Sequence, residues 1–321
     1  MIRIHALNVG QGDCAIIEHA ESRLTVVDIN RSSQMDWATL MDVVKAWNPR
    51  QFNGERFLYA YGAIDYKTLL KRSGYTVRIT DPIPYIKALI NKNGHARHGL
   101  RFISSRPDIT YFSGLWALNR DIGIASAWVP PWVNNQTPGK SEPILGKDQE
   151  FYAFLSHGTW PDISLESPSS GGRIESSDAY DIQVISPQPS AGGSSSTRDG
   201  DALPSCVLII RYGKSKMILG NNASKEIWSR IVSDCPDDIK NTSILKASHH
   251  GQARGFHMDA VKLMKPEYTI LNLGIKEISP LTTPYARICP HAVNTRHAGS
   301  MIFEMDRLGH VHLITGDKPN P

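Results

Sequence analysis

Two neighbouring histidines are the clearest chemical signal in this sequence. The chain of 321 residues contains 12 His, and His249 and His250 stand together in a Ser-His-His-Gly segment that follows the apolar run ILKA. Imidazole binds divalent metals when neutral, transfers protons near neutral pH and hydrogen bonds through either ring nitrogen. The pair is therefore a candidate site. The alternative is a structural role, in which the rings cap backbone groups.

A second candidate segment, RPDITY, combines a cation, a carboxylate and two hydroxyl groups in one short stretch. It follows the run LRFISS and contains Arg106, Asp108, Thr110 and Tyr111. A guanidinium group matches the geometry of both phosphate and carboxylate. Arg106 is therefore predicted either to bind a phosphate group or to pair with Asp108.

The flanking elements must place both segments at the ends of strands. Apolar patterning predicts strands over 100–105 and 244–248, and helical spacing predicts helices over 81–91 and 258–265. The first residues predict three antiparallel strands, and residues 205–221 predict a hairpin that ends at Asn221. Because helices alternate with strands in both halves, the pattern predicts a layered α/β (α+β) fold.

Three segments, taken in order, resemble the metallo-β-lactamase fold and, within it, the ComEC-like hydrolases that include DNA-uptake nucleases. They are LNVGQGDCAIIE, RFISSRPDITYFSGLWAL, and KMILGNNASKEIW with the following SHHG. The resemblance extends over nearly the whole chain, from Met1 to the segment 295–305. It implies an αββα sandwich with an active site at one edge of two facing sheets.

The resemblance also implies two metal ions, which lower the pKa of a bridging water and clamp a phosphate or carbonyl group. Matched residue by residue, this chain keeps only part of the ligand set. The positions that it keeps are Asp108, His249 and His250. The positions that differ carry Arg106, Thr110 and Tyr111 in place of His, Asp and His, and Asn221 in place of a bridging Asp.

Arg106 matters most among these differences, because a permanent cation repels a divalent metal. We therefore predict a degenerate, metal-free member that needs no cofactor. The alternative is an atypical zinc or manganese site built from Asp108, His157 and His249. In a third interpretation Arg106 and His249 bind nucleic acid or a nucleotide without cutting it.

Composition narrows the class of protein. Hydrophobic residues make up 40% of the chain and charged residues 21%, so the chain can form a core. The formal net charge of +4 permits nucleic acid as a partner but does not demand it. No apolar stretch approaches the roughly 20 residues that cross a bilayer, and no secretory signal is evident at the start, so we expect a cytoplasmic protein without a membrane partner. The four Cys lack metal-ligand spacing and are expected to be buried thiols.

The organisation predicted from the sequence is a single domain over 1–321. Stretches rich in Ser, Gly and Pro predict flexible insertions at about 161–180 and 187–204, around one strand. The segment AWVPPWVNN contains Trp128 and Trp132, which either pack in the core or anchor a partner. 

Three functions remain open from the sequence. The first is a catalytically degenerate scaffold or partner subunit that acts through protein partners, in a nucleic-acid-handling or phage-defence system suggested by the resemblance alone. The second is a metal-dependent phosphodiesterase or nuclease with atypical ligands. The third is a module that binds nucleic acid or a nucleotide through the altered pocket.

Overall fold

The computed structural model gives the fold of most of the chain. It describes residues 1–10, 12–21, 23–31, 80–93, 100–130, 146–158, 160, 162–166, 172–176, 180–186, 205–272 and 283–315. The predicted insertion at 187–204 and Trp132 lie outside the described residues. The prediction of one domain over 1–321 includes such residues and stays a prediction.

The first sheet has eight strands in the order β15-β14-β1-β2-β3-β4-β5-β6. The strands β1, β2 and β3 form the predicted antiparallel meander, and the strands from β3 to β6 run parallel to one another. The bounds are β1 Ile2–Ala6, β2 Ala15–Glu18, β3 Leu24–Val27, β4 Leu100–Ile103, β5 Ser126–Trp128, β6 Ser164–Glu166, β14 Met301–Met305 and β15 Val311–Thr315.

The second sheet has seven strands in the order β13-β12-β11-β10-β9-β8-β7. The predicted hairpin is confirmed as the antiparallel pair β9 and β10, and β10 to β13 are parallel. The bounds are β7 Arg173–Ser176, β8 Tyr180–Ser186, β9 Val207–Tyr212, β10 Ser215–Leu219, β11 Ile244–Lys246, β12 Tyr268–Leu271 and β13 His291–Asn294.

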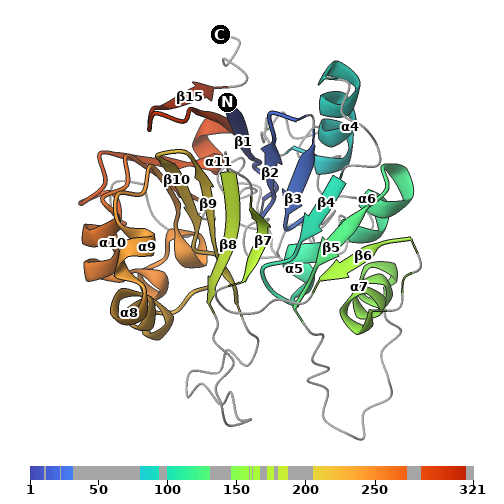
Figure 1. Ribbon diagram of the computed structural model, residues 1–321, viewed down its shortest axis with the longest axis horizontal. Helices are drawn as coiled ribbons and strands as arrows, with labels where there is room; N and C mark the ends of the chain where they lie inside the picture. The colour runs from blue at the N-terminus through green and yellow to red at the C-terminus, as the bar shows by residue number, and fades with distance from the viewer. Residues whose placement is uncertain are drawn as a thin grey trace, which may run out of the picture.

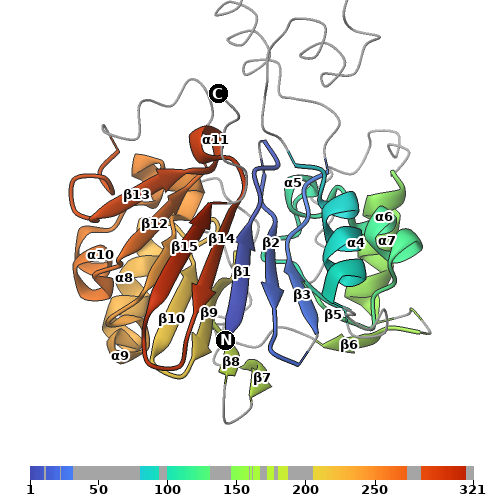
Figure 2. The same cartoon turned by 90° about the horizontal axis from the view of Figure 1, so that it is seen from above.

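The two sheets pack face to face, and helices cover their outer faces (Figures 1 and 2). One apolar core joins inward residues of both sheets, such as Ile4 of β1 and Ile210 of β9. A second lies under α4 (Pro82–Asn93), α5 (Ile109–Phe112), α6 (Leu115–Asp121) and α7 (Lys147–His157), and a third under α8 (Lys225–Asp234), α9 (Pro236–Ile239) and α10 (Met258–Met264). The short helix α11 (Thr295–Ala298) follows β13. This layering confirms the αββα sandwich.

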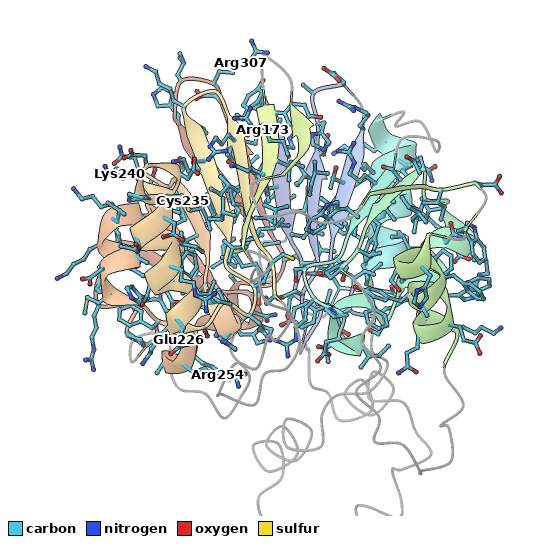
Figure 3. All side chains as sticks on the ribbon, turned by 60° about the horizontal axis from the view of Figure 1, so that its bottom comes forward. Arg173, Glu226, Cys235, Lys240, Arg254 and Arg307 are labelled. Atoms are coloured by element: carbon cyan, nitrogen blue, oxygen red, sulfur yellow. The ribbon has the colours of Figure 1, made fainter. Side chains whose placement is uncertain are left out.

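Charged side chains lie on the outer side of the helical layer over the second sheet. Glu226, Lys240 and Arg254 are exposed there and point away from the core (Figure 3). Both signs of charge are present, as expected for an ordinary solvated surface. 

Several local predictions need correction. The segment 161–180 was expected to be a flexible loop, but it contributes β6 to the first sheet and β7 to the second. Each of these strands contains only one apolar residue, Leu165 in β6 and Ile174 in β7. The alternation of apolar and polar residues that predicts a strand therefore cannot be recognised there. Trp128 is buried in the core between the sheets, so it packs and is not a partner anchor. Helix α7, which ends at His157, has no counterpart in the sequence-based prediction.

Candidate functional site

The loop after β4 uses its retained carboxylate to begin a helix. Asp108 is the N-cap of α5, and its Oδ1 accepts hydrogen bonds from Thr110 N at 3.0 Å and Thr110 Oγ1 at 2.7 Å. An Asp at this position satisfies backbone N–H groups that have no partner within the helix. Asp108 and Thr110 therefore have a local structural use that the sequence match did not predict.

Arg106 lies inside the protein, with 6% of its surface exposed. Its Nε is 3.9 Å from Asp108 Oδ2, at the long end of an ion pair. This geometry supports the interpretation in which Arg106 pairs with Asp108, and it leaves phosphate binding by Arg106 as a prediction. A guanidinium group keeps its charge in either case.

Tyr111 connects the loop after β4 to the end of the β9–β10 hairpin. Its hydroxyl donates a hydrogen bond to Asn222 Oδ1 at 2.8 Å. Burial raises the pKa of Tyr111 well above its usual value, and the negative charges of Asp13 and Asp28 raise it further, so the hydroxyl keeps its proton and acts as a donor. The bond joins two loops that belong to different sheets.

Asn221 has a different role from the bridging ligand that the resemblance implies at this position. Its Nδ2 donates to Cys206 O at 2.8 Å, and its own carbonyl accepts from His249 N at 2.7 Å. Asn221 has φ of 44°, in the left-handed region that Asn tolerates better than most residues. Asn221 therefore fixes the backbone of the hairpin end and of the His-His segment.

His249 and His250 lie in a tight turn directly after β11. Their φ angles are 48° and 60°, and Gly251 follows with φ of 100°. Successive non-glycine residues in this region are strained, so surrounding contacts must hold the turn. Ser248 supplies two of them, since its Oγ donates to Gly220 O at 3.1 Å and accepts from Trp228 Nε1 at 2.9 Å.

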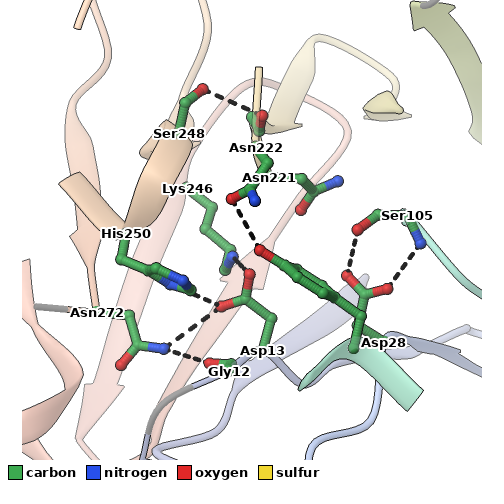
Figure 4. A network of polar contacts seen from close by, with 12 residues as sticks. Gly12, Asp13, Asp28, Ser105, Asn221, Asn222, Lys246, Ser248, His250 and Asn272 are labelled. Atoms are coloured by element: carbon green, nitrogen blue, oxygen red, sulfur yellow. Dashed lines mark hydrogen bonds and ion pairs between the residues drawn. The ribbon is translucent and has the colours of Figure 1, made fainter. Parts of the chain in front are cut away.

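The centre of the site contains a buried ion pair that sequence reasoning missed. Lys246 Nζ, at the end of β11, lies 2.5 Å from Oδ2 of Asp13, which follows the turn after β1 (Figure 4). Their exposed fractions are only 6% and 3%, and His250 Nδ1 lies 3.6 Å from the other oxygen of Asp13. A lysine inside the apolar run ILKA was the available signal, because a buried lysine needs a buried partner.

The charge state of Asp13 follows from this pair. Burial alone would raise the pKa of Asp13, but the positive charge of Lys246, with a contribution from His250, outweighs burial and holds the pKa well below its usual range. Asp13 is therefore an anion at every physiological pH, and Lys246 is its counterion.

Asn272 joins this ion pair to three loops. Its Nδ2 donates to Gly12 O at 2.5 Å and to Asp13 Oδ1 at 3.4 Å, and its backbone N donates to His250 O. Thr295 Oγ1 donates to Asn272 Oδ1 at 2.9 Å. Chain segments that are remote in sequence thus meet at one amide side chain.

A second buried carboxylate lies at the end of β3. Asp28 accepts hydrogen bonds from both the backbone N and the Oγ of Ser105, each at 2.7 Å (Figure 4). Burial raises the pKa of Asp28 to about 7, against the lowering effect of the Ser105 hydrogen bonds. Asp28 positions the start of the loop that carries Arg106, a role that its place at a strand end did not reveal.

The residues present do not fit the two-metal centre that the resemblance implies. Among the described residues, no group of three or more His, Cys, Asp and Glu side chains is placed to hold a metal ion, so the alternative set of Asp108, His157 and His249 is not brought together. His157 is exposed at the last turn of α7, and Asp108 caps α5. Arg106 adds a guanidinium group to this region, beside Asp108, and Lys246 adds the ammonium group of the ion pair with Asp13. The donor set is therefore wrong for two divalent cations.

Comparison with known proteins gives likenesses of fold only. No family model matches the chain, and no curated protein matches it. One similar solved structure is Zn(2+)-bound PqqB from Methylobacterium extorquens, with 8% identity, 76% of this chain and 69% of that chain covered, and a TM-score of 0.33. Others are the E377D mutant of CmlA beta-hydroxylase (11%, 83% and 45%, TM-score 0.38) and isothiocyanate hydrolase from Delia radicum gut bacteria (9%, 98% and 100%, TM-score 0.45).

These likenesses are distant, and the fold class rests on the sheet topology itself. The chain is an αββα sandwich, as expected from the sequence. In the described part of the chain, no helix is both long enough and apolar enough to span a membrane.

Proposed function

We propose that this chain is a catalytically degenerate member of its fold class that works as a scaffold or partner subunit. The observation that carries the proposal is the hydrogen bond from Tyr111 to Asn222, which joins the two loops where the resemblance implies a metal site. Thr110 and Asp108 are engaged in capping α5, and Asn221 holds the backbone of the hairpin end. The residues that replace ligands thus support structure at this edge.

The proposed partner is another protein. The loops at one edge of the sandwich can vary in sequence without loss of the core. Such loops commonly contain the residues that bind a partner. The assignment to a nucleic-acid-handling or phage-defence system rests on the resemblance alone, and it stays a prediction, as does the cytoplasmic location.

Metal content tests the proposal. The wild-type protein, purified without chelator, is analysed for zinc, manganese and iron by mass spectrometry, and its hydrolysis of bis(p-nitrophenyl) phosphate is measured with each metal added. We expect far less than one metal ion per chain and no hydrolysis. About two metal ions per chain, the content of a two-metal hydrolase, with hydrolysis lost on His249→Ala, would overturn the proposal in favour of a phosphodiesterase.

A variant with the ligand types restored provides the matched control. The combination R106H/T110D/Y111H/N221D replaces the four positions that differ from the pattern of the resemblance. We expect this variant to take up zinc or manganese in the same assay if it folds, as checked by circular dichroism. Uptake by the variant shows that the assay detects a metal at this edge.

Nucleic-acid binding is the outcome that would change the proposed class. Fluorescence anisotropy with a labelled single-stranded oligonucleotide, at two salt concentrations, measures it directly. We expect no saturable binding by the wild type. Binding that Arg106→Ala abolishes would replace the scaffold by a nucleic-acid-binding module.

A further inference from the structure

A buried histidine outside the candidate site lies between a phenol and a carboxylate. His5 of β1 has 1% of its surface exposed and points to the outer face of the first sheet. Its Nδ1 lies 2.8 Å from the hydroxyl of Tyr85 on α4, and its Nε2 lies 3.2 Å from Oε2 of Glu18 on β2. Tyr85, His5 and Glu18 thus form a row of three side chains that come from α4, β1 and β2.

The partners of His5 decide where its proton sits. The carboxylate of Glu18 can only accept, so Nε2 of a neutral His5 carries the hydrogen and donates it. Nδ1 then has a free lone pair, and the hydroxyl of Tyr85 must be the donor to it. The imidazole is therefore oriented as a base toward the phenol, with the carboxylate behind it.

Glu18 is itself held in place by charge. Arg3 NH1 lies 3.5 Å from Glu18 Oε1, and Arg3 Nε donates to Glu304 Oε1 at 2.8 Å. His312 stands opposite Glu304 in the β14–β15 register, so it is the next titratable group along this face. The carboxylate side chain of Glu18 is mostly buried, which keeps it close to His5.

We propose that Tyr85 is a nucleophile activated by His5 and Glu18, and that it takes phosphoryl-type electrophiles. A nucleophile within hydrogen-bond reach of a base, with the base oriented by a third group, is the geometric signature of covalent catalysis. Tyr85 is half-buried on the surface helix α4, whereas His5 is enclosed. Arg3 is partly exposed beside these residues and pairs with both Glu18 and Glu304, which fixes the carboxylate of Glu18 behind His5.

The chemical step balances without an oxidant or reductant. The phenolic O–H bond of Tyr85 breaks and its proton moves to Nδ1 of His5, while the hydrogen on Nε2 remains bound to His5 and hydrogen-bonded to Glu18. The phenolic oxygen forms a bond to phosphorus, and the bond from phosphorus to the leaving group breaks with its electron pair. The product is a phosphoryl ester of Tyr85.

An alkyl fluorophosphonate tests this site, with fluoride as the leaving group. The full chain is treated at pH 7 and the labelled residues are quantified by peptide mass spectrometry. Tyr268 is the internal control, since it is also half-buried and lies beside a histidine, but its ring stacks on His291 at a centroid distance of 5.2 Å. We expect Tyr85 to react about a hundredfold faster than Tyr268, the lower end of what a positioned base contributes.

Variants separate activation from a merely structural contact. Glu18→Gln and His5→Gln should each reduce labelling of Tyr85 to the level of Tyr268, and Tyr85→Phe should remove it, in samples whose fold is confirmed by circular dichroism. Near pH 10, where ordinary phenols ionise without help (about 10 for free tyrosine), the advantage of Tyr85 should disappear. Equal labelling of Tyr85 and Tyr268 by the wild type at pH 7 would overturn the proposal. So would labelling of Tyr85 unchanged by both Gln variants.

Discussion

The two buried carboxylates of the site, Asp13 and Asp28, have the same burial and opposite electrostatics. Both are almost fully enclosed, with 3% and 1% of their surfaces exposed. Asp13 has Lys246 as its counterion, and its pKa lies below the usual range. Asp28 has the hydroxyl and backbone N–H of Ser105 but no cation in hydrogen-bond contact among the described residues, and its pKa rises to about 7.

The contrast teaches that a counterion, and not burial, decides the charge of these groups. Desolvation is the largest influence on both carboxylates and acts in the same direction. The two also differ in what they connect. Asp13 and Lys246 join the two sheets, whereas Asp28 and Ser105 join the ends of the neighbouring strands β3 and β4. Changes to Asp13 should therefore affect the packing of the sandwich, and changes to Asp28 the loop that carries Arg106.

Removing the counterion should have the largest effect. Lys246→Met leaves Asp13 buried without its principal counterion, and we expect the free energy of unfolding, measured by urea titration at pH 7, to fall by about 3–5 kcal/mol. Adding Asp13→Asn should recover much of that loss. Lys216→Met is the control, because Lys216 donates to the carbonyls of Asp238 and Lys240 at a partly exposed position. An equal loss in both lysine variants would refute the special role of Lys246.

Asp28 should make the stability fall with rising pH. Because its pKa is higher in the folded state than its ordinary value of 3.8, the folded protein holds the proton more tightly. This stabilisation is complete below pH 3.8 and is lost as the pH rises through about 7, which amounts to about 2–3 kcal/mol between pH 5 and 8. Asp28→Asn should flatten this slope in urea titrations. Asp259→Asn, at an exposed position on α10, should leave the slope unchanged.

Asp13 predicts the opposite dependence at lower pH. Its pKa is depressed in the folded state, so its stabilisation is present above the ordinary value near 3.8 and is lost as the pH falls below that value. Urea titrations of Asp13→Asn with Lys246→Met should lack this acid-side loss. Retention of the full loss in the double variant would show that other carboxyl groups cause it.

The bond between Tyr111 and Asn222 should have a smaller effect. Tyr111→Phe removes one hydrogen bond and is expected to lower the free energy of unfolding by about 1 kcal/mol. A double-mutant cycle with Asn222→Ala isolates the interaction. Strict additivity of the two losses would mean that the bond contributes nothing to the contact between the loops.

His250 should have the smallest effect on the ion pair. Its Nδ1 lies 3.6 Å from Asp13, beyond a short hydrogen bond, and the side chain is partly exposed. His250→Gln is expected to change the free energy of unfolding by less than about 1 kcal/mol at pH 7. A loss as large as that of Lys246→Met would show that His250 is a principal partner of Asp13.

Much of the framework could be predicted from the sequence because its signals are local. Period-two and helical apolar patterns located the meander, the hairpin, α4 and α10. The weaker elements β6, β7 and α7 were missed, since their surroundings or their mixed composition hide the period. The strand ends predicted from the sequence also placed Arg106 correctly on the loop after β4, and His249 on the loop after β11.

The sequence by itself determined the layered sandwich and the residue types at its edge, because apolar periodicity and turn chemistry act between near neighbours in the chain. Only the tertiary structure decided which of those residues meet. Asp13 lies in a turn near the start and Lys246 near the end of an inner strand, and neither is conspicuous alone. Their ion pair forms because the two sheets pack together and exclude water, which makes an uncompensated buried charge costly.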